Sequence, residues 1–216
     1  DYTKDTHPKD FMRGGSLQAS RAFSEFAQLH PQRAVSLIIN FKPRLQETPV
    51  GIALEGLSKS NYPKNELFDL ILQLDSKGFR SLEFRTDAAR ALDAKVEEDV
   101  GLPDFMCNLL ESWLDSSVEE SEKDKEEFES REDKETVRSI LWGDRGIHVI
   151  PQGSYTILEA LTKAFLLKRP VAVDRWLTVL ETHLRRNDKA NVWHKMLHYF
   201  RYLSNCDCSR ATKYLS

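Results

Sequence analysis

The chain has 216 residues, with 31 Lys and Arg against 34 Asp and Glu, a net charge of −3 and a hydrophobic share of 40%. The normal apolar share excludes a collagen-like or fully disordered chain, and the near balance of charge excludes a long basic nucleic-acid tail. No run of roughly 18 to 20 apolar residues occurs, so we expect no membrane span. Only three cysteines are present, which excludes a disulfide scaffold and indicates a reducing, cytoplasmic location.

The ends of the sequence indicate a piece of a longer protein. The chain opens at Asp1 without an initiator Met or a signal segment, and its last helical pattern runs to Ser216 without a polar cap. We therefore expect that any catalytic domain of the parent protein lies outside this piece.

Charge divides the chain into unequal parts. The net charge is −4 for residues 1–115, −6 for 116–135 and +7 for 136–216. The acidic stretch holds few large apolar residues, so it buries too little surface to offset the roughly 1 to 2 kcal/mol per residue that ordering a backbone costs. We expect a division into four parts: a flexible lead-in at 1–15, an N-terminal helical block at 16–115, an acidic flexible insertion at 116–135 and a C-terminal helical block at 136–216.

Apolar residues recur at helical spacing along both blocks. Prolines, which suit the first position of a helix, stand near the starts of several of these segments, and Thr48 before Pro49 is a predicted N-cap. Residues 147–150 form the only strand-like run, which is too short to build a sheet. The predicted apolar stripes lie, in chain order, within 22–27, 34–41, 50–57, 67–72, 88–96, 105–113, 158–165, 173–184 and 192–203.

These stripes predict about nine or ten helices joined by short turns, which place neighbouring helices antiparallel. The fold class is therefore all-α. Pro31 and Pro63 are 32 residues apart, and Pro63 and Pro103 are 40 apart. Two-helix repeats have periods of roughly 33 to 47 residues, so we predict antiparallel helix pairs stacked as an α-solenoid. An irregular helical bundle is the alternative.

The proline-started helix pairs resemble HEAT or armadillo-type repeats, and this resemblance spans most of the chain. Residues 150–184, IPQGSYTILEALTKAFLLKRPVAVDRWLTVLETHL, also resemble helical-repeat regions of large bacterial nucleotide-driven proteins, including some defence NTPases. Neither resemblance supplies catalytic residues. The chain contains no GxxxxGK[ST] motif, so the second resemblance implies an NTPase domain elsewhere in the parent protein.

The strongest metal candidate in the sequence combines His194, His198, Cys206 and Cys208. The two histidines are one helical turn apart, as metal ligands often are. However, the Cys-x-Cys spacing is shorter than in structural zinc sites, and the apolar stripe within 192–203 places both histidines on the opposite, polar face. We therefore predict no metal site, and nothing in the sequence indicates a cofactor.

The basic C-terminal block is a candidate binding surface, because Lys and Arg neutralise phosphates. A solvated helix surface, or a patch neutralised by the acidic insertion, is the simpler interpretation, since the pI of the chain is near 6.1 and a nucleic-acid-binding domain typically exceeds 9. The candidate binding residues are Arg169, Arg175, Arg185, Arg186, Lys189 and Lys195.

No catalytic pattern stands out. GxSxG, HExxH and GxGxxG are absent, and most acidic residues fall on polar helix faces or in the acidic run. Trp113 and Trp176 are predicted core residues, whereas Trp142 is predicted to be exposed. We predict a non-catalytic protein-interaction or scaffolding module with a protein partner. The alternatives are a nucleic-acid-binding helical repeat and the sensor region of a bacterial defence NTPase.

Overall fold

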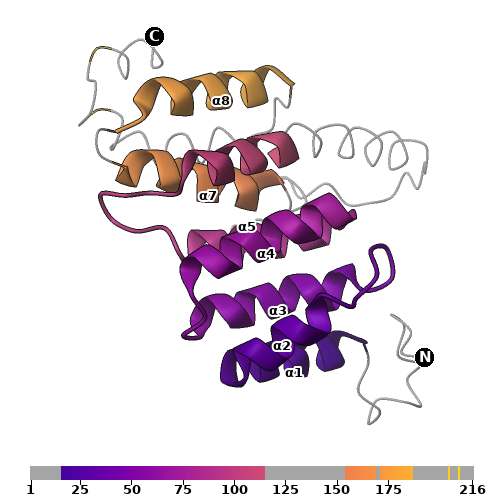
Figure 1. The fold of residues 1–216 in the computed structure, drawn as a ribbon. Coiled ribbons are helices and arrows are strands. Elements are labelled where there is room, and N and C mark those ends of the chain that lie inside the picture. The colour runs from indigo at the N-terminus through magenta and orange to yellow at the C-terminus, as the bar shows by residue number, and fades with distance from the viewer. Residues whose placement is uncertain (1–15, 115–153, 169–170, 187–203, 205–208, 210–216) are drawn as a thin grey trace, which may run out of the picture.

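The computed structural model describes residues 16–114, 154–168, 171–186, Ser204 and Ser209 (Figure 1). Within these residues the regular secondary structure is helical, and apart from isolated β-bridges no strand occurs. This confirms the prediction of an all-α fold. The predicted lead-in at 1–15, the acidic insertion at 116–135 and the strand-like run at 147–150 lie outside the described residues.

Within the described residues, seven labelled helices follow one another, and a further helical segment at 104–114 lies between α5 and α7 in the sequence. In chain order the labelled helices are α1 (Ser16–Leu29), α2 (Pro31–Ile38), α3 (Glu47–Lys59), α4 (Lys64–Lys77), α5 (Leu82–Asp93), α7 (Ser154–Leu167) and α8 (Val173–Arg186).

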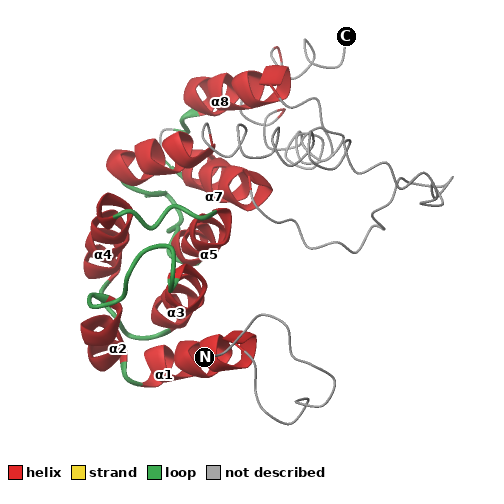
Figure 2. Ribbon diagram, turned by 90° about the vertical axis from the view of Figure 1, so that its right-hand side faces the viewer, coloured by secondary structure: helices red, strands yellow, loops and turns green. Residues whose placement is uncertain are grey.

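The helices form two layers (Figure 2). We call α1, α3, α5 and α7 the odd layer: α1 packs on α3, α3 on α5, and α5 on α7. Helices α2 and α4 and the segment 104–114 lie on the other side, and α8 packs on α7. From Ser16 to Glu47 is 31 residues and from Glu47 to Leu82 is 35, so the first three helices of the odd layer begin at similar intervals.

Local sequence signals account for several helix ends. Pro31 begins α2 with only His30 between it and the end of α1, and at this first position its missing N–H needs no partner. Gly78 ends α4 in the left-handed region at φ 103°, a conformation that glycine adopts without steric penalty. Ser81 caps α5 by accepting a hydrogen bond from the Phe84 N–H at 3.2 Å.

The predicted N-cap at Thr48 is wrong. Helix α3 begins at Glu47 and its N-cap is Gln46, so Thr48 already lies inside the first turn and Pro49 follows it. Proline fits the first positions of a helix because the first four N–H groups have no partner within it, so Pro49 marks the first turn of α3 and not its first residue.

The core lies between the two layers and contains most of the predicted stripe residues. Trp113 and Trp176 are each 1% exposed, which confirms both as core residues. Each indole N–H has a partner: Trp113 donates to Asp75 at 2.7 Å and Trp176 donates to Thr162 at 3.0 Å. Two stripe positions are exposed, Ala22 and Phe105, and Phe105 lies at the edge of the Phe68 ring with 47% of its surface exposed.

The connection between α5 and the segment 104–114 packs closely on α7. Gly101 has φ 67°, and a Cβ atom added there would lie 2.3 Å from the backbone oxygen of Ala164. Glycine is therefore required at this position both by its conformation and by the proximity of α7.

Among the helices in the described ranges, none has the length and apolar character that crossing a bilayer requires.

Candidate functional site

A groove of about 760 Å³ crosses α1, α3 and α5 of the odd layer. Each helix contributes side chains one turn apart, the spacing that places them on one face. Polar Ser, Thr and Gln side chains and the half-buried Ile52 and Leu82 complete the lining. The charged lining residues are Arg21 and Glu25 from α1, Glu55 and Lys59 from α3, and Glu83, Asp87 and Arg90 from α5.

Two glycines of α3 let its neighbours approach closely at this groove. A Cβ atom at Gly56 would lie 2.2 Å from the backbone oxygen of Ser24 in α1, and one at Gly51 would lie 2.8 Å from Oδ2 of Asp87 in α5. Real Cβ atoms do not approach other atoms this closely, so α1 lies at this distance from α3 because position 56 is glycine, whereas at Gly51 the side chain of Asp87 would have to move. The groove is thus built on rigid, closely packed helices.

Three charged residues meet on the floor of the groove, and we call them the floor triad: Glu55, Asp87 and Arg90. Arg90 Nη1 contacts Asp87 Oδ1 at 2.7 Å and Glu55 Oε1 at 3.4 Å, so one guanidinium joins carboxylates from two helices. The Asp87 side chain is 11% exposed, whereas the Arg90 side chain is 34% exposed. The floor triad has two negative charges and one positive charge when all three groups are ionised.

The environment raises the pKa of Asp87 from 3.8 to about 7. Burial is the largest cause, because it penalises the charged form, and the negative charge of Glu55 adds to it. The charge and hydrogen bond of Arg90 oppose the rise without cancelling it, and Glu83 contributes a smaller increase. A perturbed carboxyl group in a groove marks a candidate site on physical grounds.

A second hollow of about 660 Å³ adjoins the groove at the N-terminal ends of α3 and α5. It is organised by Glu47, whose carboxylate accepts hydrogen bonds from the N–H groups of Arg44 at 2.8 Å, Arg80 at 3.0 Å and Ser81 at 2.5 Å. Burial by itself raises the pKa of Glu47, but these bonds, led by that of Ser81, outweigh it and lower the pKa. The chain thus fills this anion-binding position with its own carboxylate.

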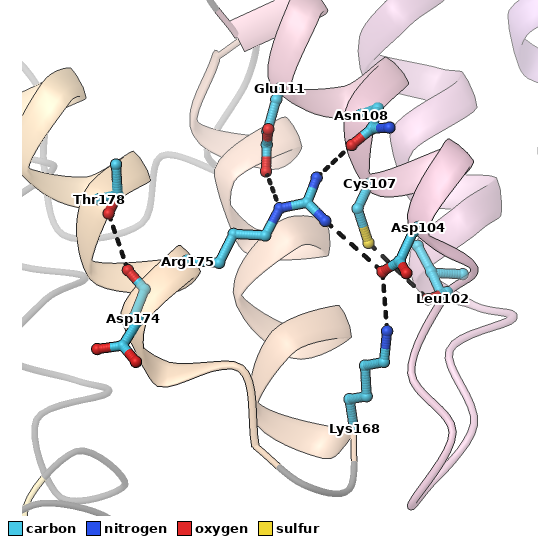
Figure 3. A network of polar contacts seen from close by, with 9 residues as sticks. All are labelled: Leu102, Asp104, Cys107, Asn108, Glu111, Lys168, Asp174, Arg175 and Thr178. Carbon is cyan, nitrogen blue, oxygen red and sulfur yellow. Dashed lines mark hydrogen bonds and ion pairs between the residues drawn. The ribbon is translucent and has the colours of Figure 1, made fainter.

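Of the predicted binding residues, Arg175 is the one whose side chain is described, and it is engaged within the fold (Figure 3). Its Nε donates to Glu111 at 2.8 Å, its Nη2 donates to Asn108, and its Nη1 lies 3.6 Å from Asp104. The guanidinium also lies over the ring of Phe165 at 5.2 Å. The hydrogen bond to Glu111 raises the pKa of Arg175, so the charge is fully retained in this pairing.

Two further cations of the C-terminal block are paired with acidic residues of the N-terminal block. Lys168 contacts Asp104 at 2.8 Å and, by that bond, holds the pKa of Asp104 below its ordinary value. Lys163 contacts Asp93 at 2.8 Å. A solvated surface and neutralisation by the acidic insertion are the two simpler interpretations of this basic block from the sequence. Among the described residues, carboxylates at positions 93–111 pair with Lys163, Lys168 and Arg175.

The remaining predicted binding residues are not placed as a surface. Arg185 and Arg186 lie in the last turn of α8, where the backbone is described and the side chains are not. Arg169, Lys189 and Lys195 lie outside the described residues, as do the histidines and cysteines of the zinc candidate. Across the described ranges, no group of three or more potential metal ligands gathers.

Sequence reasoning did not identify the groove residues as a site. The signal was present as polar residues one turn apart on the faces opposite the apolar stripes of α1, α3 and α5. The sequence pattern does not indicate that these three helices lie side by side. Acidic residues that look dispersed along the chain are brought together by the layer.

Comparison of the chain with protein-family models, with curated proteins and with solved structures gives no match. In the part of the chain that the structure describes, the fold and the groove are those of an all-α protein with a charged groove across three helices of one layer.

Proposed function

We propose that this chain is a non-catalytic protein-interaction module whose stacked helix pairs form an α-solenoid, with a protein partner lying in the groove across α1, α3 and α5. The observation that carries the proposal is the groove itself. Three successive helices of the odd layer line a single open surface with charged, polar and half-buried apolar side chains. Mixed polar and apolar lining on rigid helices suits recognition by surface complementarity.

Two regularities support the solenoid arrangement. Each helix of the odd layer packs on the next one, and the first three begin 31 and 35 residues apart, at Ser16, Glu47 and Leu82. Repeats that contact only their neighbours produce an extended face, on which equivalent positions of successive helices line up. The resemblance to HEAT or armadillo repeats agrees with these intervals.

Photo-crosslinking tests the proposal with a matched control face. Benzoylphenylalanine replaces Gln28 or Thr48, which line the groove, or Asn65 or Gln73, which are exposed on α4 in the other layer. The full chain is expressed in its native cells and irradiated. We expect the same protein adduct from both groove positions and no such adduct from α4. Equal yields from the two faces, or no adduct from the groove, would contradict the proposal.

The charge of the C-terminal block favours one other candidate function, nucleic-acid binding, because residues 136–216 carry a net charge of +7. The pairs made by Lys163, Lys168 and Arg175 argue that part of this charge serves the fold. A fluorescence titration with a 20-base-pair duplex at low salt tests this candidate. Unchanged affinity after Arg185, Arg186 and Lys189 are all changed to Glu would eliminate it.

The third candidate, a sensor region of a defence NTPase, rests on the resemblance of residues 150–184 alone. A P-loop encoded in the same reading frame would support it, and a gene that encodes no further domain would eliminate it.

A further inference from the structure

When Glu55 and Asp87 are both ionised, the floor of the groove carries more negative charge than Arg90 neutralises. In the floor triad, Arg90 is shared between Glu55 and Asp87. Its contact with Asp87 uses Oδ1, and among the described residues no hydrogen bond reaches Oδ2, which lies over Gly51. Asp87 lines the groove, and its side chain is 11% exposed. A largely buried carboxylate that keeps one oxygen open to a groove can accept a hydrogen bond from a donor that enters the groove.

The charges around Asp87 do not remove this excess. Helix α3 contributes Glu55 and Lys59, and α1 contributes Arg21 and Glu25. Each of these two helices therefore adds one charge of each sign. On its own helix, Asp87 is accompanied by Glu83 and Arg90. On the far side of α5, the cation of α7 is already engaged, because Lys163 contacts Asp93 at 2.8 Å and Glu159 at 3.9 Å. The charged groove lining therefore has four acidic and three basic residues.

We propose that the floor triad receives one arginine or lysine side chain of the protein partner, with the incoming cation bonding to Asp87 and Glu55 beside Arg90. This inference rests on the proposed function, since it names the chemistry of the partner at the same groove. The half-buried Ile52 and Leu82 offer apolar contacts for the methylene stem of such a side chain. Arginine binds more tightly than lysine here, because its planar fork reaches two carboxylates at once.

The groove has the capacity for this ligand. A volume of about 760 Å³ lies within the roughly 300 to 1,000 Å³ of typical ligand pockets, so it accommodates a long side chain and the backbone on either side of it. The incoming cation also supplies what the buried carboxylate lacks, a second charged donor. Binding then favours the ionised form of Asp87, whose pKa in the free protein is about 7. Near neutral pH, binding is therefore accompanied by release of a proton from Asp87.

NMR titration of the isotopically labelled full chain provides the test. The probes are nine-residue Gly-Ser peptides with one central residue, which is Arg, Lys, Gln or Glu. We expect millimolar binding of the Arg peptide, weaker binding of the Lys peptide, and no saturation with the Gln or Glu peptides. The shifted amides are those of Gly51, Glu55 and Asp87. For the Arg peptide, affinity rises by up to about tenfold between pH 6 and pH 8, as Asp87 ionises.

Matched variants separate the floor triad from general charge. Asp87→Asn and Glu55→Gln each weaken binding of the Arg peptide at pH 8 by at least threefold, and Asp87→Asn abolishes the rise with pH. Asp69→Asn makes the same chemical change on the exposed face of α4 and leaves the affinity unaltered. Circular dichroism establishes that each variant is folded, and Glu55→Gln serves if Asp87→Asn is not.

Equal affinity for the Arg and Gln peptides, or wild-type affinity in both floor variants, would overturn the inference. Failure of this inference can be told apart from failure of the proposed function, because the crosslinking experiment depends on Gln28 and Thr48 and requires no basic side chain. Groove crosslinks without selectivity for Arg retain the interaction module and reject the cation receptor. Absent groove crosslinks reject both.

Discussion

At the scale of single residues, the packing of the odd layer depends on where α3 lacks a side chain. A Cβ atom at Gly56 would meet a backbone oxygen of Ser24, whereas a Cβ atom at Gly51 would first meet the side chain of Asp87. A side chain is able to turn away and a backbone carbonyl within a packed helix is not. The two positions therefore differ in how much an added methyl group disturbs them.

We expect Gly56→Ala to destabilise the protein by about 1 to 2 kcal/mol. Overpacking costs typically 1 to 3 kcal/mol, and the upper part of that range, about 2 to 3 kcal/mol, applies here because the obstacle is a backbone oxygen. The better helix propensity of Ala returns about 1 kcal/mol. Gly51→Ala should be less harmful, because the Asp87 side chain can adjust. Urea unfolding measures both, with Gln73→Ala on the exposed face of α4 as the control. A Gly56→Ala variant as stable as the wild type would show that α1 and α3 do not pack as described.

Asp87 makes stability depend on pH, and its sign follows from its raised pKa. The ordinary pKa of the carboxyl group is 3.8 and its pKa in the folded chain is about 7. Between these values the folded state binds more protons, so the contribution of Asp87 to stability falls as pH rises. Asp87→Asn removes this dependence. From pH 5 to pH 8, we expect the variant to gain about 1 to 3 kcal/mol relative to the wild type.

Urea unfolding of the wild type and Asp87→Asn at pH 5, 6, 7 and 8 tests this expectation. The exposed Asp69→Asn variant is the matched control and should follow the wild type at every pH. A constant difference between Asp87→Asn and the wild type would mean that the folded and unfolded chains ionise Asp87 alike.

At the scale of helices, Glu47 connects elements that are far apart in the sequence. It lies at the start of α3, accepts a bond from Arg44 in the preceding loop, and accepts two more from Arg80 and Ser81 before α5. Ser81 itself caps α5. One carboxylate thus fixes the α2–α3 loop and the starts of α3 and α5, which are two of the three helices that line the groove.

We expect Glu47→Gln to destabilise the protein by about 2 to 3 kcal/mol at pH 7, because charge-assisted hydrogen bonds are lost and an amide N–H₂ faces backbone donors. The pKa of Glu47 is lowered by folding, so its contribution is present above the ordinary value of 4.5 and is lost as pH falls through the folded value. The difference between variant and wild type should therefore shrink below about pH 4. Thermal unfolding at a series of pH values measures this difference, and Glu83→Gln, an exposed change in the first turn of α5, is the control.

At the scale of the whole molecule, the sequence predicted the helices and most of their buried faces, because helical periodicity is a local property. Trp113 and Trp176 illustrate this success, since each lies in an apolar stripe and is buried. The groove could not be predicted in the same way. Glu55 and Asp87 meet through packing of α3 on α5, and the placement of Glu47 on the N–H groups before α5 depends on the same packing. Contacts between distant helices leave no periodic signal in either helix.

The layered arrangement also predicts how stability is distributed along the chain. Helices α3 and α5 have a neighbour on both sides within the odd layer, whereas α1 has α3 on one side among the described helices. In a stack held by nearest-neighbour contacts, a flanked unit opens only when its interfaces with neighbours break, so protection is highest in the middle. Native-state hydrogen exchange should therefore rank the amides of α3 and α5 above those of α1 and α2. Gly56→Ala, at the α1–α3 contact, should lower protection in α1 more than in α5. If the opening free energies were equal across α1 to α5, and Gly56→Ala changed them equally, the protein would instead be an irregular bundle that unfolds as one unit.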